Sequence, residues 1–332
     1  MTSPLQDLRH VRYYPAIGLS TVFRPLPKGK REKLDVTYTP KEGGVTLRFR
    51  GADALGIPEQ TLLLALVEMA QHSYNTNPRQ CLLDADSSDP VGKALWQGLH
   101  RDAGIIREQT VCFSTSWQEL ARRSNKTTGG SVQHLLQEQL KRLCETVIWE
   151  KGANEVVPRH QSYLVSWLHG SDKRVHLALN YRLASTLFGE RYAQVSMAER
   201  LELPSDPAKA IHAFLSTALR AGHALDIGID TLTGRLWPEL GKDVPEGTRK
   251  RRFMNVRNAL KDLANLSGWE VNFKRHDLVS IKRISAKVRD MTGPGLIASV
   301  SPSYREPAKA PEAFGHAAFG ASDVSGLFLT KP

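Results

Sequence analysis

The chain has 332 residues, of which 41% are hydrophobic and 24% are charged, and a formal net charge of +11. This composition supports two packed domains and excludes a wholly disordered protein. The longest apolar segment, Leu62–Val67, is far shorter than the roughly 18 residues that span a bilayer, and the first residues lack a secretory signal, so we expect a cytoplasmic protein without a membrane span. The three cysteines are widely spaced, which argues against disulfides or a zinc site.

The N-terminal part is predicted to contain an arm, a hairpin and a long helix. Residues 1–33 include Pro25, Pro27 and a charge run and are expected to form an extended arm, with an exposed linker as the alternative. Leu34–Thr39 and Val45–Arg50 alternate apolar and polar residues around a Gly-rich turn, which predicts a β-hairpin. A helical apolar pattern begins at Pro58, and a loop rich in Asn, Asp and Ser follows over Ser73–Pro90.

A helix-turn-helix pattern comes next. Ser116 and Glu119 form the sequence signature of a capping box at the start of its first helix. The order of elements is typical of a winged helix-turn-helix. These elements are a strand over Val111–Phe113, a helix over Trp117–Arg123, a turn over Asn125–Gly130, a second helix to about Leu143, and strands over Val147–Lys151 and Tyr163–Leu168.

The second half repeats this order. We expect strands over Val175–Asn180 and Ala193–Met197, helices over Ala208–Ala221, Asp230–Leu236 and Thr248 to about Leu266, and strands over Ala224–Ile229, Trp269–Phe273 and Leu278–Ile284. The prediction is therefore an α+β fold with tandem winged helix-turn-helix domains over 34–170 and 171–289. In residues 290–332, 22 of the 43 side chains are Gly, Ala, Ser or Pro, which predicts a flexible tail of open function.

Most of the positive charge lies on the second predicted domain. Residues 249–289 hold twelve basic and three acidic side chains, a net charge of +9 that leaves +2 for the rest of the chain. Such a segment can be a solubilising face. Its position on the second helix of a helix-turn-helix and on the following hairpin instead favours binding to duplex DNA.

Residues on that helix are predicted to divide into base-reading and phosphate-binding groups. The apolar stripe of this helix is predicted to be Phe253, Val256, Leu260 and Leu263. At about 100° per residue, Arg251, Asn255 and Asn258 lie opposite this stripe. Arg can pair with guanine and Asn with adenine in the major groove, so these three are expected to read bases. The basic residues at the flanks and on the hairpin are expected to bind phosphates, which positions the protein without specifying sequence. These are Arg249, Lys250, Arg252, Arg257, Lys261, Lys274, Arg275, Lys282 and Arg283.

The first helix-turn-helix has a weaker charge. Residues 117–151 carry a net charge of only +2, so contact with DNA and contact with a protein are both open. If this unit touches DNA, the contacting residues are expected to be Arg122, Arg123, Thr127, Thr128, His134 and Lys141.

Short motifs in order over residues 10–285 point to a family. They are Lys33–Tyr38, Leu177–Asn180, Val195–Met197, Ile229–Leu232 with Trp237-Pro238, Arg249–Arg252 with Val256-Arg257, Gly268-Trp269 and, more weakly, His10–Arg12. Together they resemble the replication initiator protein C family of IncQ-type plasmids. The resemblance implies two winged-helix domains that bind directly repeated sequences, called iterons, at the plasmid origin. It also implies opening of a neighbouring A·T-rich segment and recruitment of the plasmid helicase and primase, and it leaves self-association into a dimer open.

Motifs for enzymatic chemistry are missing from the sequence. There is no Gly-x-x-x-x-Gly-Lys-Ser/Thr phosphate loop, Asp84–Asp89 lacks the Gly and Glu of a calcium loop, and the eleven histidines show no metal-ligand spacing. We therefore expect no catalytic residue, cofactor or metal. A winged-helix transcriptional repressor is the alternative function, and it would bind inverted half-sites as a dimer, whereas an initiator binds direct repeats.

Overall fold

The structure is a computed structural model of the chain, and it describes residues 10–40, 44–100, 108–152, 160–170, 174–238 and 244–284. All of these residues belong to one compact unit. The predicted tail over 290–332 and the first nine residues of the predicted arm lie outside the described residues. Within the described ranges, no helix is long and apolar enough to cross a membrane.

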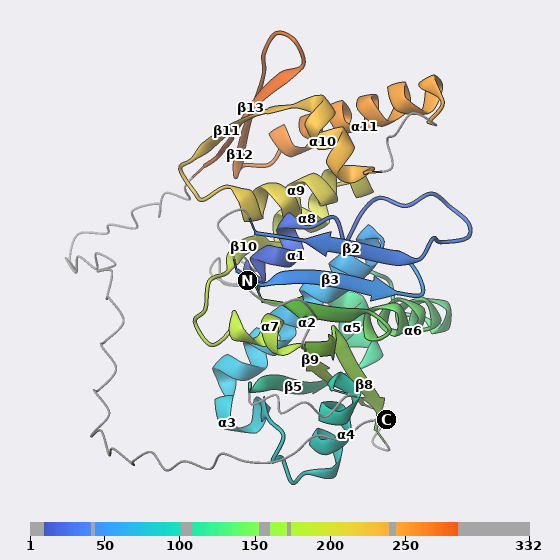
Figure 1. The fold of residues 1–332 in the computed structure, drawn as a ribbon, viewed down its shortest axis with the longest axis vertical. Coiled ribbons are helices and arrows are strands. Elements are labelled where there is room, and N and C mark those ends of the chain that lie inside the picture. The colour runs from blue at the N-terminus through green and yellow to red at the C-terminus, as the bar shows by residue number, and fades with distance from the viewer. Residues whose placement is uncertain are drawn as a thin grey trace, which may run out of the picture. The chain divides into compact units, whose positions relative to one another are not determined.

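The fold mixes helices with antiparallel sheets, as the α+β prediction states (Figure 1). The elements of the first half are β1 (His10–Tyr13), α1 (Pro15–Leu19), β2 (Leu34–Tyr38), β3 (Thr46–Gly51), α2 (Ile57–Thr76), α3 (Pro78–Cys81), β4 (Leu82–Leu83), α4 (Pro90–Leu99), β5 (Thr110–Thr115), α5 (Trp117–Arg123), α6 (Gly130–Cys144), β6 (Val147–Lys151), β7 (His160–Tyr163) and β8 (Val165–His169). Those of the second half are β9 (Val175–Leu179), α7 (Tyr181–Ser185), β10 (Ala193–Ser196), α8 (Met197–Glu202), α9 (Asp206–Ala218), β11 (Ala224–Gly228), α10 (Ile229–Leu236), α11 (Glu246–Ala264), β12 (Trp269–Phe273) and β13 (Leu278–Arg283).

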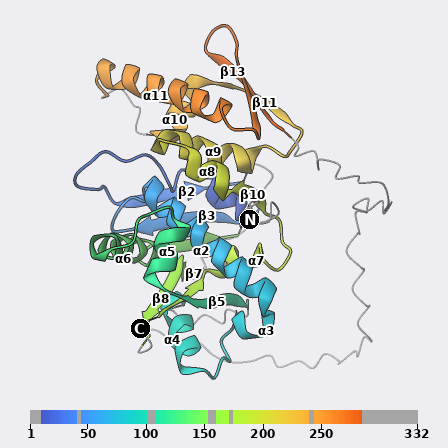
Figure 2. The same cartoon turned by 180° about the vertical axis from the view of Figure 1, so that it is seen from behind.

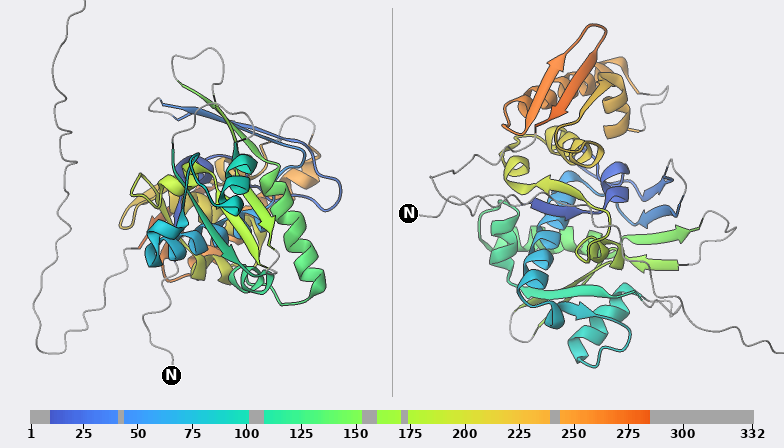
Figure 3. Two further views of the ribbon diagram at one scale, coloured as in Figure 1. Left: turned by 90° about the horizontal axis from the view of Figure 1, so that it is seen from below. Right: turned by 90° about the vertical axis from the view of Figure 1, so that its left-hand side faces the viewer.

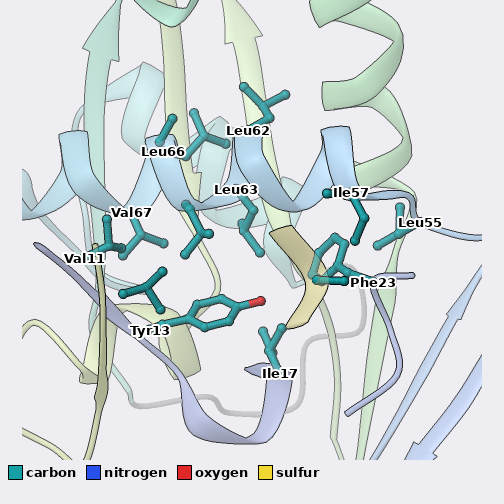
Figure 4. Close-up of a cluster of buried hydrophobic side chains, with 14 of the residues drawn as sticks. Val11, Tyr13, Ile17, Phe23, Leu55, Ile57, Leu62, Leu63, Leu66 and Val67 are labelled. Atoms are coloured by element: carbon teal, nitrogen blue, oxygen red, sulfur yellow. The ribbon is translucent and has the colours of Figure 1, made fainter. Parts of the chain in front are cut away.

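Helix α2 runs through the centre of the core. A proline in its first turn and a hydrogen bond from the Gly56 amide to the Glu59 carboxylate (2.9 Å) fix where it begins. Its residues from Leu62 to Ala70 are almost all buried, as expected for a helix with apolar side chains on every face. Figure 4 shows apolar side chains leaving both sides of the helix, with Leu63 and Val67 directed toward Tyr13 and Val11.

The N-terminal segment is built into this core, so the prediction of an extended arm is wrong for residues 10–23. Strand β1 pairs with β10, with Val11 opposite Val195. The side chains of Val11, Tyr13 and Ile17 are buried. A four-residue strand gives little local pattern, and its partner is far away in the sequence, so periodicity alone could not reveal this pairing.

Two four-stranded sheets organise the first half. The predicted hairpin forms as β2 and β3, and β6 and β7 extend it in the order β2-β3-β6-β7. The second sheet has the order β4-β5-β9-β8. Strand β9, assigned above to the second domain, thus pairs with β5 and β8 of the first half. The boundary placed between residues 170 and 171 therefore falls within a sheet.

The second half ends in three helices and a small sheet that closely follow the predicted elements. Helix α9 packs against α10 and α11, and β13 is the central strand of the order β11-β13-β12. Figures 1 and 2 show this group from opposite sides, and Figure 3 shows the β12–β13 hairpin extending past the helices. In the first half, by contrast, β5 and β6 belong to different sheets, so the order of elements recurs but the strand pairing does not.

Candidate nucleic-acid interface

Helix α11 presents one buried and one exposed face. Val256, Ala259, Leu260 and Leu263 are buried and form a continuous stripe. This stripe packs toward α9, α10 and β12. Because the rest of the helix surface is rich in Lys, Arg and Asn, packing of the apolar stripe leaves a basic and polar face directed outward.

The three predicted base-reading residues all lie on the exposed side of α11, but not equally near its centre. At about 100° per residue, Asn258 lies about 150° and Arg251 about 130° from the middle of the buried stripe, whereas Asn255 lies only about 90° from it. The stripe differs from the predicted one because Ala259 is buried and Phe253 is only half-buried. Arg251 and Asn258 therefore share one face, and Asn255 lies at its edge.

The sequence reasoning missed a residue at the centre of this face. Met254 is 49% exposed and lies about 170° from the middle of the buried stripe. A methionine within an amphipathic helix is ordinarily assigned to the core, which is why composition gave no signal. The observed stripe, centred on Val256, Ala259, Leu260 and Leu263, is what locates it.

The predicted phosphate-binding residues of α11 are mostly exposed, but Arg252 is not. The Nε atom of Arg249 and the Nζ atom of Lys250 lie 3.7 and 3.6 Å from the Glu246 carboxylate, and both side chains are largely exposed. Lys261 is also exposed. Arg252 is half-buried, with its Nη1 atom shielded from solvent, and lies over the Trp237 ring, 5.4 Å from its centroid, so it is not on the outward face. Surface ion pairs of this kind contribute about 0–1 kcal/mol, so a phosphate can readily replace the carboxylate.

The hairpin lies beside this helix. Arg257 of α11 approaches Asp277 in the hairpin turn (3.6 Å) and lies over the ring of Phe273. His276 and Asp277 adopt positive φ angles of 58° and 57°, which turn the chain tightly between β12 and β13. The Arg257 contact therefore joins the exposed face of α11 to the hairpin tip.

Cationic side chains on the hairpin remain accessible. The Nζ atom of Lys274 bonds to the Asp226 carboxylate at 2.8 Å on the surface, and this hydrogen bond lowers the pKa of Asp226. Arg275 is exposed at the turn. Lys282 is half-exposed and its Nζ atom lies 4.0 Å from the Glu270 carboxylate.

Arg283 does not lie where a phosphate-binding residue should. Its guanidinium donates to the backbone oxygens of Ser216 (2.9 Å), Leu219 (3.2 Å) and Gln194 (2.8 Å). Burial lowers its pKa. The side chain thus attaches β13 to α9 and β10. The signal for this was the two-residue alternation of β13, which places position 283 on the same face as the buried Val279 and Ile281.

The candidate residues of the first half belong to α5, the turn after it, and α6. Arg122 is 70% exposed and pairs with Glu119. Arg123 is mostly buried and bridges Glu119 (2.7 Å) to Glu68 of α2 (3.3 Å), which gives it a structural role. The remaining predicted residues are exposed, namely Thr127, Thr128, His134 and Lys141. Among the described residues, no group of three or more His, Cys, Asp or Glu is arranged to hold a metal ion.

A family profile and two solved structures are similar to this chain. The sequence profile of the family described as Replication protein C (RepC) matches residues 5–284. A crystal structure of selenomethionine derivatives of domains 2 and 3 of RctB has a TM-score of 0.48, 10% identity, and covers 78% of this chain and 94% of that one. A second crystal structure of RctB domains 2-3 has a TM-score of 0.49, 9% identity, and covers 82% and 97%. These scores are too low to carry a functional argument, and a search of curated proteins gives no match.

Proposed function

The chain belongs to the Replication protein C (RepC) family, and from this premise we propose that it is a plasmid replication initiator that binds directly repeated iterons in duplex DNA. The family match extends over both halves of the described fold. The observation that carries the DNA-binding part of the proposal is the outward face of α11, where Arg251 and Asn258 lie among exposed lysines and arginines beside a basic hairpin.

The proposed DNA-binding module is a winged helix-turn-helix over the second half of the fold. Its support is the order α9, β11, α10, α11 and the β12–β13 hairpin, with the three strands in one sheet. In such a module the second helix of the pair enters the major groove and the hairpin contacts the neighbouring backbone. Arg251 and Asn258 then face base edges, while Asn255 lies nearer the groove wall.

The phosphate contacts come from the weakly paired cations. Exchange of a surface carboxylate for a DNA phosphate costs little at Lys250, Lys274 and Lys282. With about six such contacts, the logarithm of the binding constant should fall with the logarithm of the salt concentration at a slope of about −5. Arg249, Arg257, Lys261 and Arg275 complete this proposed set.

The remaining parts of the proposal follow from family membership. We propose that the exposed residues of α5 and α6 form a second, weaker DNA or protein contact. Iteron binding is proposed to open a neighbouring A·T-rich segment, and the protein to recruit the helicase and primase without catalytic chemistry of its own.

Footprinting of the full chain on the origin of its own replicon tests this function. The expected result is regularly spaced protection over tandem direct repeats, with permanganate-reactive thymines in the adjacent A·T-rich segment. Arg251→Ala should weaken the protection of the repeats, whereas Lys93→Ala, which removes an exposed charge from α4, should leave it unchanged. A single protected palindrome at a promoter would instead indicate a repressor and contradict the proposed initiator.

A further inference from the structure

Met254 is the most exposed of the large apolar side chains in the described part of the chain, at 49%. A single exposed apolar residue is common and by itself indicates nothing. What distinguishes Met254 is its position, because it lies at the centre of the outward face of α11. Its neighbour Phe253 packs against the hydrophobic core, whereas Met254 does not belong to that cluster.

The surroundings of Met254 on the helix are polar on all sides. Residues three and four positions away are its neighbours on a helix surface, and here they are Lys250, Arg251, Arg257 and Asn258. These side chains offer charge and hydrogen bonds. Met254 is therefore an isolated apolar group in the middle of a face otherwise suited to hydrogen bonding.

The side chain of Met254 also has room to move. It borders a hollow of about 700 Å³ between α10 and α11, whose lining includes Thr233, Gly234 and Phe253. Methionine is unbranched and flexible, so a side chain with open space on one side can adjust to a partner surface.

Thymine is the base that presents an apolar group, its 5-methyl, in the major groove, and apolar side chains are the groups that contact it. We propose that Met254 is a specificity-determining residue that contacts the 5-methyl group of one thymine in each repeat, next to the bases faced by Arg251 and Asn258. This inference rests on the proposed function, because it requires α11 to lie in the major groove.

The experiment replaces thymines in a repeat duplex by deoxyuridine, one position at a time, and measures binding of the full chain. Deoxyuridine keeps the base pair and removes only the methyl group. Burial of one such group is equivalent to about a fourfold change in affinity. The wild-type chain should lose about fourfold at one thymine position, and Met254→Ala should bind the thymine and uracil duplexes equally.

Two further variants separate apolar contact from shape. Met254→Leu should keep the preference for thymine, while Met254→Gln, of similar length but polar, should lose it. Ile284→Ala serves as the matched control, since Ile284 is 43% exposed and lies outside α11 and the hairpin turn, and it should retain the full preference. Unchanged thermal unfolding of Met254→Ala is expected, because the exposed side chain contributes little to packing.

The failures of the two proposals can be told apart. If the wild-type chain binds the repeat no more tightly than a shuffled duplex, the proposed function is wrong. If it prefers the repeat but responds to no thymine-to-uracil replacement, the role of Met254 is wrong. The same conclusion holds if Met254→Ala still distinguishes thymine from uracil.

Discussion

Replacing Arg283 by Ala should destabilise the fold and leave the number of phosphate contacts unchanged. Lys282→Ala should instead leave the stability nearly unchanged and remove one phosphate contact. The two residues are adjacent on β13 and carry the same charge. Arg283 donates to three backbone oxygens of α9, the segment after it, and the segment that includes β10. Lys282 points outward and has a carboxylate oxygen 4.0 Å away.

The expected magnitudes follow from these contacts. Hydrogen bonds from a charged group contribute about 1.5–3 kcal/mol each, but Arg283 is partly solvated, so we expect a total loss of about 2 kcal/mol in the free energy of unfolding. That corresponds to a decrease of about 3 °C in Tm for a chain of this size. Lys282→Ala removes a surface pair and should change stability by less than about 0.5 kcal/mol.

The assays are thermal and urea unfolding together with the salt dependence of binding to the repeat duplex. Lys282→Ala should reduce the salt slope by about 0.9, the value for one released phosphate contact, and Arg283→Ala should leave it unchanged. A reduced slope with full stability for Arg283→Ala would show that its guanidinium binds phosphate, and the reasoning from its backbone contacts would then be refuted.

Three other predictions concern the core and the DNA contacts. Arg200 is fully buried and donates hydrogen bonds to Gln60 and Thr61 of α2 and to the backbone oxygen of Lys209 in α9. Arg200→Ala should therefore lower the free energy of unfolding, measured by urea titration, by about 3–5 kcal/mol. A loss below about 1 kcal/mol would contradict this structural role. Burial lowers the pKa of the His212 imidazole, so this ring is neutral in the folded protein. The stability that the neutral ring allows is fully present above pH 6.5, and it decreases as the pH falls because the unfolded state then binds a proton that the folded state does not. The midpoint of urea unfolding should therefore be lower at pH 5 than at pH 7.5, and a pH-independent midpoint would contradict this role of His212. Arg251→Ala should relax selectivity at one base position, whereas Lys274→Ala should lower the affinity for all duplexes equally, as measured by binding to single-substitution duplexes. Equal losses of affinity from both variants would contradict the division into base-reading and phosphate-binding residues.

Local patterns in the sequence predicted many of the elements. The capping residue Ser116 accepts a hydrogen bond from the Glu119 amide (3.1 Å) at the start of α5, as its spacing indicates. The apolar period of α11 and the alternation of β12 and β13 likewise correspond to observed elements. These signals are short-range, because caps, turns and periodicity depend on residues within a few positions of one another.

Strand pairing and the roles of individual surface residues depended on the tertiary structure. Nothing near Val11 in the sequence indicates that it pairs with Val195, and nothing near β5 indicates that its partner is β9. The sequence by itself determined that a basic, polar helix face would exist around Arg251. Only the fold decided that Met254 lies at its centre and that Arg283 faces inward, because the direction of a side chain is set by what packs against the opposite side of its helix or strand.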